Sequence, residues 1–241
     1  MPLLQFNEAQ IQAIQHNTGP CMVIAGPGSG KTTVLTHRVR YLIERYGVNP
    51  SDILVITFTK AAAEQMKLKF KGLSEGRNSA VTFGTFHAVF FTILKAAYNY
   101  SAHCIIKPQI QHEFVKDQMC RLELEYDDEK EAVAGVLSEI SCVKGEAVNI
   151  DEYESRCIPP QSFRIMYRAY DDMLVRKHLI DFDDMIVQCR ELLMQREDYK
   201  RAWQNKYKYI LIDEFQDINK AQFDVCLLYT SPSPRDRSLS R

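Results

Sequence analysis

A glycine-rich stretch from Ala25 to Thr32, reading AGPGSGKT, contains the residue types needed to bind the phosphates of a nucleotide. Glycines permit a tight turn that aims backbone N–H groups at phosphate oxygens, and a following helix adds the positive end of its dipole. In such a loop Lys31 would reach the terminal phosphates, and the hydroxyl of Thr32 would bind Mg²⁺. An ordinary Gly/Ser turn with a chance lysine is the alternative. However, an apolar run precedes the stretch and a helical pattern follows it, so we predict a phosphate loop in which Ala25 replaces the usual glycine.

Two acids, Asp213 and Glu214, directly follow the apolar run 209–212. In open α/β folds, ligands bind outside the carboxyl ends of the strands, where these acids would lie. The first acid suits Mg²⁺, through water, and the second suits the orientation and deprotonation of an attacking water. Solvated acids at a strand end are the alternative, but here they occur together with a phosphate loop, as two parts of one mechanism. We therefore predict that both acids act with Lys31 in catalysis and that Asp213 shares the metal with Thr32.

The elements that must position these residues alternate between strand and helix in the first part of the chain. A short helix over 6–17, with Asn7 as its N-cap, comes first. Strands are expected at 20–25, 53–57 and 80–83, and helices at 31–46, 60–73 and 87–98. This alternation is typical of a parallel sheet in an α/β domain.

Strand signals then vanish from about residue 98 to about residue 205. Helical patterns lie at 109–124, 128–142, 160–178 and 182–195, and a buried strand returns at 209–213. We therefore expect an α/β domain interrupted by an all-helical insertion. Residues 1–98 and 180–225 would form the α/β domain, and residues 99–179 the insertion.

The composition is that of an ordinary globular protein. Of 241 residues, 46% are hydrophobic and 25% are charged, and the net charge is −1. This total does not favour a nucleic-acid binder, yet residues 60–77 hold five basic and two acidic residues, so one face can still be basic. The seven cysteines form no Cys-x-x-Cys pair, and neither a secretory leader nor a membrane-spanning run is visible. These features predict a cytoplasmic protein with reduced thiols and no membrane partner.

Several stretches, in order and spacing, resemble the UvrD/Rep/PcrA-type DNA helicases of superfamily 1. The matching stretches are Phe6-Asn7-x-x-Gln10 (the adenine-reading Q motif), 25–32 (motif I), 56–62 (motif Ia), 84–87 (a DNA-contact motif), 181–185 (the element after the inserted subdomain) and 213–222 (motif II). The resemblance extends to about Val225. The sequence departs from the family at Thr33, where arginine is frequent, and at Phe215 and Ile218, where tyrosine and threonine are usual.

The resemblance implies a RecA-like domain of an ATP-dependent DNA helicase or translocase, which moves 3′ to 5′ in DNA repair or replication. ATP and Mg²⁺ would be its cofactors, single-stranded DNA its substrate, and repair or recombination proteins its candidate partners. The implied ATP-binding residues are Gln10, Ala25, Gly26, Pro27, Gly28, Ser29, Gly30, Lys31, Thr32 and Thr33. The implied DNA-binding residues are Phe58, Thr59, Thr85 and His87.

The chemistry of these side chains is compatible with the implied roles. The Gln10 amide can donate to and accept from an adenine edge, although a solvated helix glutamine is the alternative. Phe58 precedes a basic helix, which suits stacking on single-stranded bases, although composition alone favours core packing equally. Thr85 and His87 can donate to phosphates or bases, but a lone histidine is more often structural.

The resemblance also predicts that the chain is part of a longer motor. Motif III and a second RecA-like domain do not follow motif II, so this chain alone would bind Mg-ATP and DNA weakly with little turnover. Residues 226–241 are expected to be a non-native tail, because Cys226 to Asp236 matches the translation of a transposon-end adapter used in sequencing libraries. Two alternative functions are the motor of a recombination helicase–nuclease and an ATP-gated DNA-binding protein without unwinding.

Overall fold

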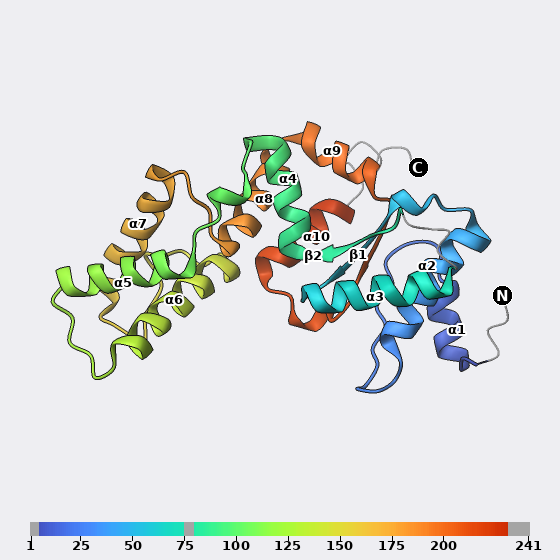
Figure 1. Ribbon diagram of the computed structural model, residues 1–241, viewed down its shortest axis with the longest axis horizontal. Helices are drawn as coiled ribbons and strands as arrows, with labels where there is room; N and C mark the ends of the chain where they lie inside the picture. Colours follow the sequence, from blue (N-terminus) through green and yellow to red (C-terminus); the bar gives the residue numbers. More distant parts are fainter. Residues whose placement is uncertain (1–4, 75–79, 231–241) are drawn as a thin grey trace. The chain divides into compact units, whose positions relative to one another are not determined.

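The computed structural model describes residues 5–74 and 80–230. These residues fall into two compact units (Figure 1). The first unit contains Met1–Phe86 and Arg201–Asp217, and the second contains His87–Lys200 and Ile218–Arg241. Each unit therefore combines segments that are distant in the sequence.

Three parallel strands form the sheet of the first unit (Figure 1). The strand order is β2 (Thr82–Thr85), β1 (Ile53–Thr57) and β3 (Tyr209–Ile212), so that β1 is paired on both sides. All five residues of β1 are buried, as expected for a central strand whose two faces are covered. The register pairs Thr57 with Thr85 and Ile56 with Ile212. The carboxyl ends of the three strands therefore lie at one edge of the sheet.

The helices α1 (Glu8–Gln15), α2 (Lys31–Tyr46) and α3 (Lys60–Leu73) also belong to the first unit. The 3₁₀-helix η1 (Pro50–Asp52) leads into β1. α2 and α3 pack against each other, and their apolar sides share one core with the sheet. The buried residues of this core are Val39, Leu42, Ile53, Val55, Met66, Phe70, Val81 and Leu211. α1 packs on α2 through a smaller buried cluster of Ala13, Ile14 and Val34.

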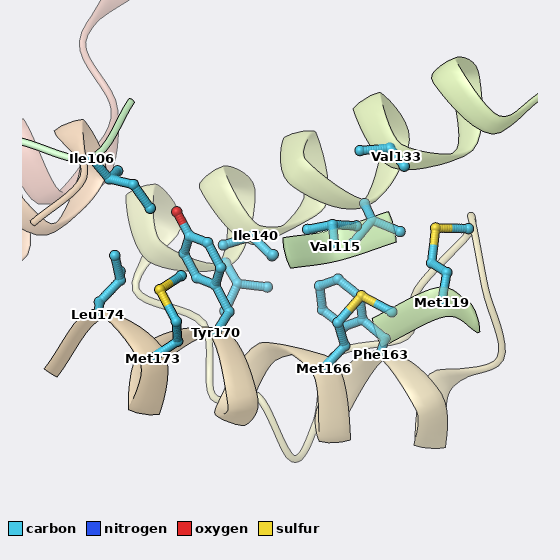
Figure 2. Close-up of a cluster of buried hydrophobic side chains, with 12 residues drawn as sticks. Ile106, Val115, Met119, Val133, Ile140, Phe163, Met166, Tyr170, Met173 and Leu174 are labelled. Carbon is cyan, nitrogen blue, oxygen red and sulfur yellow. The ribbon is translucent and has the colours of Figure 1, made fainter. Parts of the chain in front are cut away.

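The second unit is helical in the part that the structure describes. Its elements are α4 (Phe86–Tyr98), η2 (Ala102–Cys104), α5 (Pro108–Arg121), α6 (Glu129–Glu146), α7 (Pro160–Arg176), α8 (Phe182–Gln195) and α10 (Lys220–Thr230). The chain passes between the units after the first residue of α4, within α9 (Glu197–Lys206) and directly after η3 (Phe215–Asp217). In Figure 2, Phe163, Met166 and Tyr170 of α7 point towards side chains of α5 and α6, and together they form one buried apolar cluster. α8 packs against α6 and α10.

Most of the predicted elements are present at or near their expected positions. The prediction is confirmed for α2, α3, α8 and β1. The capping role of Asn7 is also confirmed, because its side chain accepts from the Gln10 N–H at 2.9 Å while the Gln10 side chain accepts from the Asn7 N–H at 3.0 Å. β2 begins two residues later than expected, at Thr82. The prediction omits α9 and α10; in α9 only Trp203 is buried, so little apolar periodicity marks that helix.

The predicted strand at 20–25 is wrong, because this run is unpaired and lies outside the sheet of the first unit. Met22 and Ile24, which a buried strand would enclose, are 69% and 91% exposed. An apolar run favours burial but does not specify a hydrogen-bonding partner, and a strand requires both. Both edges of β1 are already occupied by β2 and β3.

The compact units have different bounds from the expected division into residues 1–98 with 180–225 and residues 99–179. α8 and α10 fall in the second unit, because α8 packs against α6 and α10. The expected division follows changes in the sequence pattern, whereas a compact unit reflects packing, so that division remains a prediction.

Within the described residues, every helix is too short or too polar to span a bilayer. All seven cysteines are free thiols.

Candidate functional site

The glycine-rich loop ends where α2 begins. Gly28 and Gly30 have φ values of 74° and 81°, a left-handed conformation that glycine adopts without strain. Gly30 is the N-cap of α2, and the Ser29 N–H donates to the Gly26 carbonyl at 3.3 Å, which closes the turn. The first N–H groups of an α-helix have no acceptor within the helix, so the start of α2 offers N–H donors and a positive dipole to an anion.

Lys31 lies between this loop and the acids that follow β3. Its Nζ donates to the Ala25 carbonyl at 3.4 Å and lies 4.0 Å from Oε2 of Glu214. Both side chains are partly exposed, at 32% for Lys31 and 41% for Glu214. The structure therefore brings the predicted phosphate-binding lysine and the predicted general base together at the carboxyl edge of the sheet.

Asp213 is fixed by the sheet itself. Its N–H donates to the Ile56 carbonyl at 2.9 Å, which extends the β1–β3 ladder one step past the end of β3. Burial, and then the charge of Glu214, raise the pKa of the Asp213 carboxyl. A bound cation would oppose both effects, because it favours the charged carboxylate.

Glu214 has a left-handed backbone, with φ of 51°. This conformation is uncommon for residues other than glycine and marks local strain, which clusters at functional sites. The turn after it is closed by the Asp217 N–H, which donates to the Glu214 carbonyl at 3.0 Å. The Gln216 side chain donates to Oε2 of Glu214 at 2.7 Å, so this oxygen faces both Gln216 and Lys31.

Gln10 connects α1 to the phosphate loop. Its Nε2 donates to the Ser29 carbonyl at 3.1 Å, while its Oε1 completes the cap of α1. One amide hydrogen and one lone pair of Oε1 remain for a ligand, because an amide group has two donors and two acceptor sites.

α2 holds α1 in place by contacts near the end of α1. Arg38 donates to the Ala13 carbonyl at 2.8 Å, and the Tyr46 hydroxyl donates to the Gln15 carbonyl at 2.7 Å. These bonds satisfy carbonyls at the C-terminal end of α1, where helix carbonyls have no intrahelical partner. α1 and α2 thereby form one support for Gln10 and Lys31.

Three predicted DNA-binding residues lie at the same edge of the sheet. Phe58 directly follows β1 and Phe86 directly follows β2, and their rings meet edge to face with centroids 5.9 Å apart. Phe86 is buried, whereas Phe58 is 38% exposed and presents part of its ring to solvent. The hydroxyl of Thr59 accepts from the Ala62 N–H at 3.1 Å and so caps α3. Thr85 is the last residue of β2, opposite Thr57.

His87, the fourth predicted DNA-binding residue, belongs to the second unit. Its ring meets the Phe182 ring edge to face, with centroids 5.3 Å apart. Burial lowers the pKa of His87, and the charge of Asp183 partly offsets that shift. The imidazole is therefore mainly neutral at pH 7.

The sequence did not single out two residues that shape this site. Arg38 contacts a carbonyl 25 positions away, and no spacing rule marks such a contact. Gln216 stands within the DEFQD stretch, but its bond to Glu214 depends on the left-handed turn, which the residue types do not reveal.

The sequence of this chain is similar to the sequences of known proteins. The sequence model of the UvrD/REP helicase N-terminal domain matches residues 6–233. The chain is 33% identical over 240 residues to the ATP-dependent DNA helicase Rep of Escherichia coli (strain K12), covering 96% of this chain and 35% of that protein. It is 32% identical over 241 residues to the ATP-dependent DNA helicase PcrA of Staphylococcus aureus (strain COL), covering 95% and 32% of the two proteins. PcrA of Staphylococcus epidermidis (strain ATCC 12228 / FDA PCI 1200) is 32% identical over 228 residues, covering 92% and 31%. The chain thus spans about a third of the length of these curated relatives.

Proposed function

This chain belongs to the UvrD/REP helicase family, whose N-terminal domain it matches over residues 6–233, and we propose that it is the ATP-binding portion of an ATP-dependent DNA helicase. The intact protein would move 3′ to 5′ along single-stranded DNA in repair or replication. Residues 1–98 and 180–225 would form a RecA-like domain, with residues 99–179 as its helical insertion. Residues 226–230 lie in α10, while the rest of the predicted non-native tail, 231–241, lies outside the described residues.

The observation that carries this proposal is the 4.0 Å approach of Lys31 Nζ to Glu214 Oε2. Lys31 would bind the terminal phosphates of ATP together with the N–H groups at the start of α2. Glu214 would orient the attacking water and accept its proton, and its bond from Gln216 supports the required orientation. Gln10 would bind adenine with the donor and acceptor that its own contacts leave free.

The oxygens of Thr32 and Asp213 fit Mg²⁺, because that ion prefers hydroxyl, carboxylate and water ligands. Asp213 directly follows β3, and partial burial and the charge of Glu214 raise its pKa more than the charge of Lys31 lowers it. These two residues would hold the ion, which when bound neutralises charge on the phosphates.

Phe58 is the proposed stacking residue for single-stranded bases. Its ring is partly exposed, it is supported by the buried ring of Phe86, and it precedes a helix that carries four lysines. Stacking on an aromatic ring tolerates any base sequence, as a motor requires. Thr59, Thr85 and His87 would add contacts to the DNA backbone.

DNA-stimulated ATP hydrolysis by the intact protein tests this function. Lys31→Ala should abolish ATP binding, whereas Glu214→Gln should preserve binding and lower the hydrolysis rate about 10²–10⁴-fold, the usual contribution of a general base. Glu64→Gln in α3 is the matched control, because that side chain is 65% exposed and should leave the rate unchanged. An unchanged rate in Glu214→Gln would contradict the proposal.

A further inference from the structure

The second unit contains a buried lysine surrounded by aspartates. Lys144 of α6 has a side chain that is only 3% exposed. Its Nζ lies 2.6 Å from Asp184, 3.0 Å from Asp181 and 3.1 Å from Asp171. Burial opposes the charge of Lys144, but the three carboxylates outweigh burial and raise its pKa. These four residues form what we name the Lys144 cluster.

The charged side chains of the Lys144 cluster are a weak source of stability compared with apolar side chains of the same size. Charges removed from water lose hydration that their mutual attraction often fails to restore, and apolar residues of the same size frequently serve as well. The cluster also has three acids for one lysine. Burial, and then the charge of Asp181, accordingly raise the pKa of Asp184 to about 7. In some proteins such clusters provide directional bonds that favour one arrangement of the helices that carry them.

The helix that the Lys144 cluster fixes is α8, at its first turn. One oxygen of Asp181 accepts from the Asp184 N–H at 2.7 Å and caps α8, while the other accepts from Lys144. Ser141, one turn before Lys144 on α6, donates to Asp183 at 2.5 Å. α6 therefore holds the start of α8 through both Lys144 and Ser141.

The same turn of α8 also contacts His87. Phe182 lies between Asp181 and Asp183 in the chain, and its ring meets the His87 ring at 5.3 Å with an interplanar angle of 77°. Asp183 is the charged group that acts on His87. His87 is thus bordered by a turn of α8 that is bonded to α6 through Lys144 and Ser141, and all of these residues belong to the second unit.

We propose that Lys144 is a positioning residue for His87: it holds the first turn of α8 so that Phe182 keeps the imidazole in a fixed orientation for DNA. The DNA role of His87 rests on the function proposed above. The effect of Lys144 on the orientation of the His87 ring does not depend on that function, and it can be measured without DNA.

The test uses the 241-residue chain with Lys144→Met. NMR should show NOEs between the ring protons of His87 and Phe182 in the original protein and not in the variant. Affinity for oligo(dT), measured at pH 8 where His87 is neutral, should fall about tenfold, a change of about 1.4 kcal/mol. ATP affinity should stay unchanged, because Gln10 and Lys31 belong to the first unit.

Two further variants make the result interpretable. Lys144→Met/Asp184→Asn removes one charge of each sign, so it replaces the single variant if unpaired carboxylates prevent folding, and it should behave in the same way. Lys130→Met is the matched control, because Lys130 is an exposed lysine of the same helix and should change nothing.

NOEs that persist in both Lys144 variants would overturn the proposal, and so would their loss with unchanged oligo(dT) affinity. If the original chain failed to bind oligo(dT), the proposed role of His87 in DNA binding by this chain would fail instead. The NOEs would still decide whether Lys144 holds the two rings together.

Discussion

Gln10→Glu separates the helix cap that the structure shows for this side chain from the adenine contact that we propose for it. Glutamate keeps an oxygen for the Asn7 N–H, and Glu at this position completes a capping box as well as Gln does. It cannot donate to the Ser29 carbonyl or to an acceptor on adenine. We therefore expect α1 to remain folded while adenine recognition is lost.

The expected change in the free energy of unfolding is smaller than the expected change in affinity for ATP. Loss of the exposed bond to Ser29 costs about 0.5–1.5 kcal/mol, and a negative charge in the first turn of α1 stabilises the helix by about 0.3–1 kcal/mol. The free energy of unfolding should therefore fall by no more than about 1.2 kcal/mol. A bidentate amide–adenine contact is worth about 1–3 kcal/mol, which corresponds to about 5- to 150-fold in affinity for ATP.

Calorimetric titration with Mg-ATP and with Mg-tripolyphosphate measures the two parts. The added carboxylate repels both ligands alike, so the ratio of their Kd values isolates the contribution of adenine. We expect this ratio to shift against ATP in Gln10→Glu. An unchanged ratio would refute adenine recognition by Gln10 and would leave it only the helix cap and the contact to Ser29.

Three further predictions concern single residues. Phe58→Ala should weaken oligo(dT) binding by about 1–3 kcal/mol. Leu68→Ala removes an exposed apolar side chain of α3 and should leave that binding unchanged. Equal effects of the two variants in a binding titration would exclude specific stacking by Phe58. Arg38→Met should lower the free energy of unfolding by about 1–3 kcal/mol and reduce ATP affinity, because the end of α1 loses the bonds that Arg38 donates to the carbonyls of Ala13 and His16. Denaturant unfolding and calorimetry would detect both changes, and an unchanged ATP affinity would show that these bonds do not support Gln10. Burial, and then the charge of Asp181, raise the pKa of Asp184 from 3.8 to about 7. The contribution of Asp184 to the free energy of unfolding is therefore present below pH 4 and is lost as the pH rises through 7. Asp184→Asn should flatten the pH dependence of that free energy in denaturant unfolding, and an identical pH profile would contradict the raised pKa of Asp184.

The sequence by itself determined much of the local structure of this protein, although not the run 20–25, α9 or α10. Patterns within ten to twenty residues specify α2, α3, α8 and β1, since helical periodicity and a short β-branched run are properties of neighbouring residues. The AGPGSGKT stretch predicted a phosphate loop, and two of its three glycines, Gly28 and Gly30, occupy left-handed positions that favour glycine.

Only the tertiary structure decided which of these segments meet. It brings Lys31 to Glu214, joins Gln10 to Ser29, and leaves the apolar run 20–25 exposed rather than in the sheet. It also gathers three aspartates from two other helical segments around the buried Lys144. Strand pairing and buried ion pairs depend on partners distant in the chain, and the energy of each contact depends on burial that only the complete packing creates. A sequence pattern therefore names the chemical groups, while the fold determines which groups act on each other.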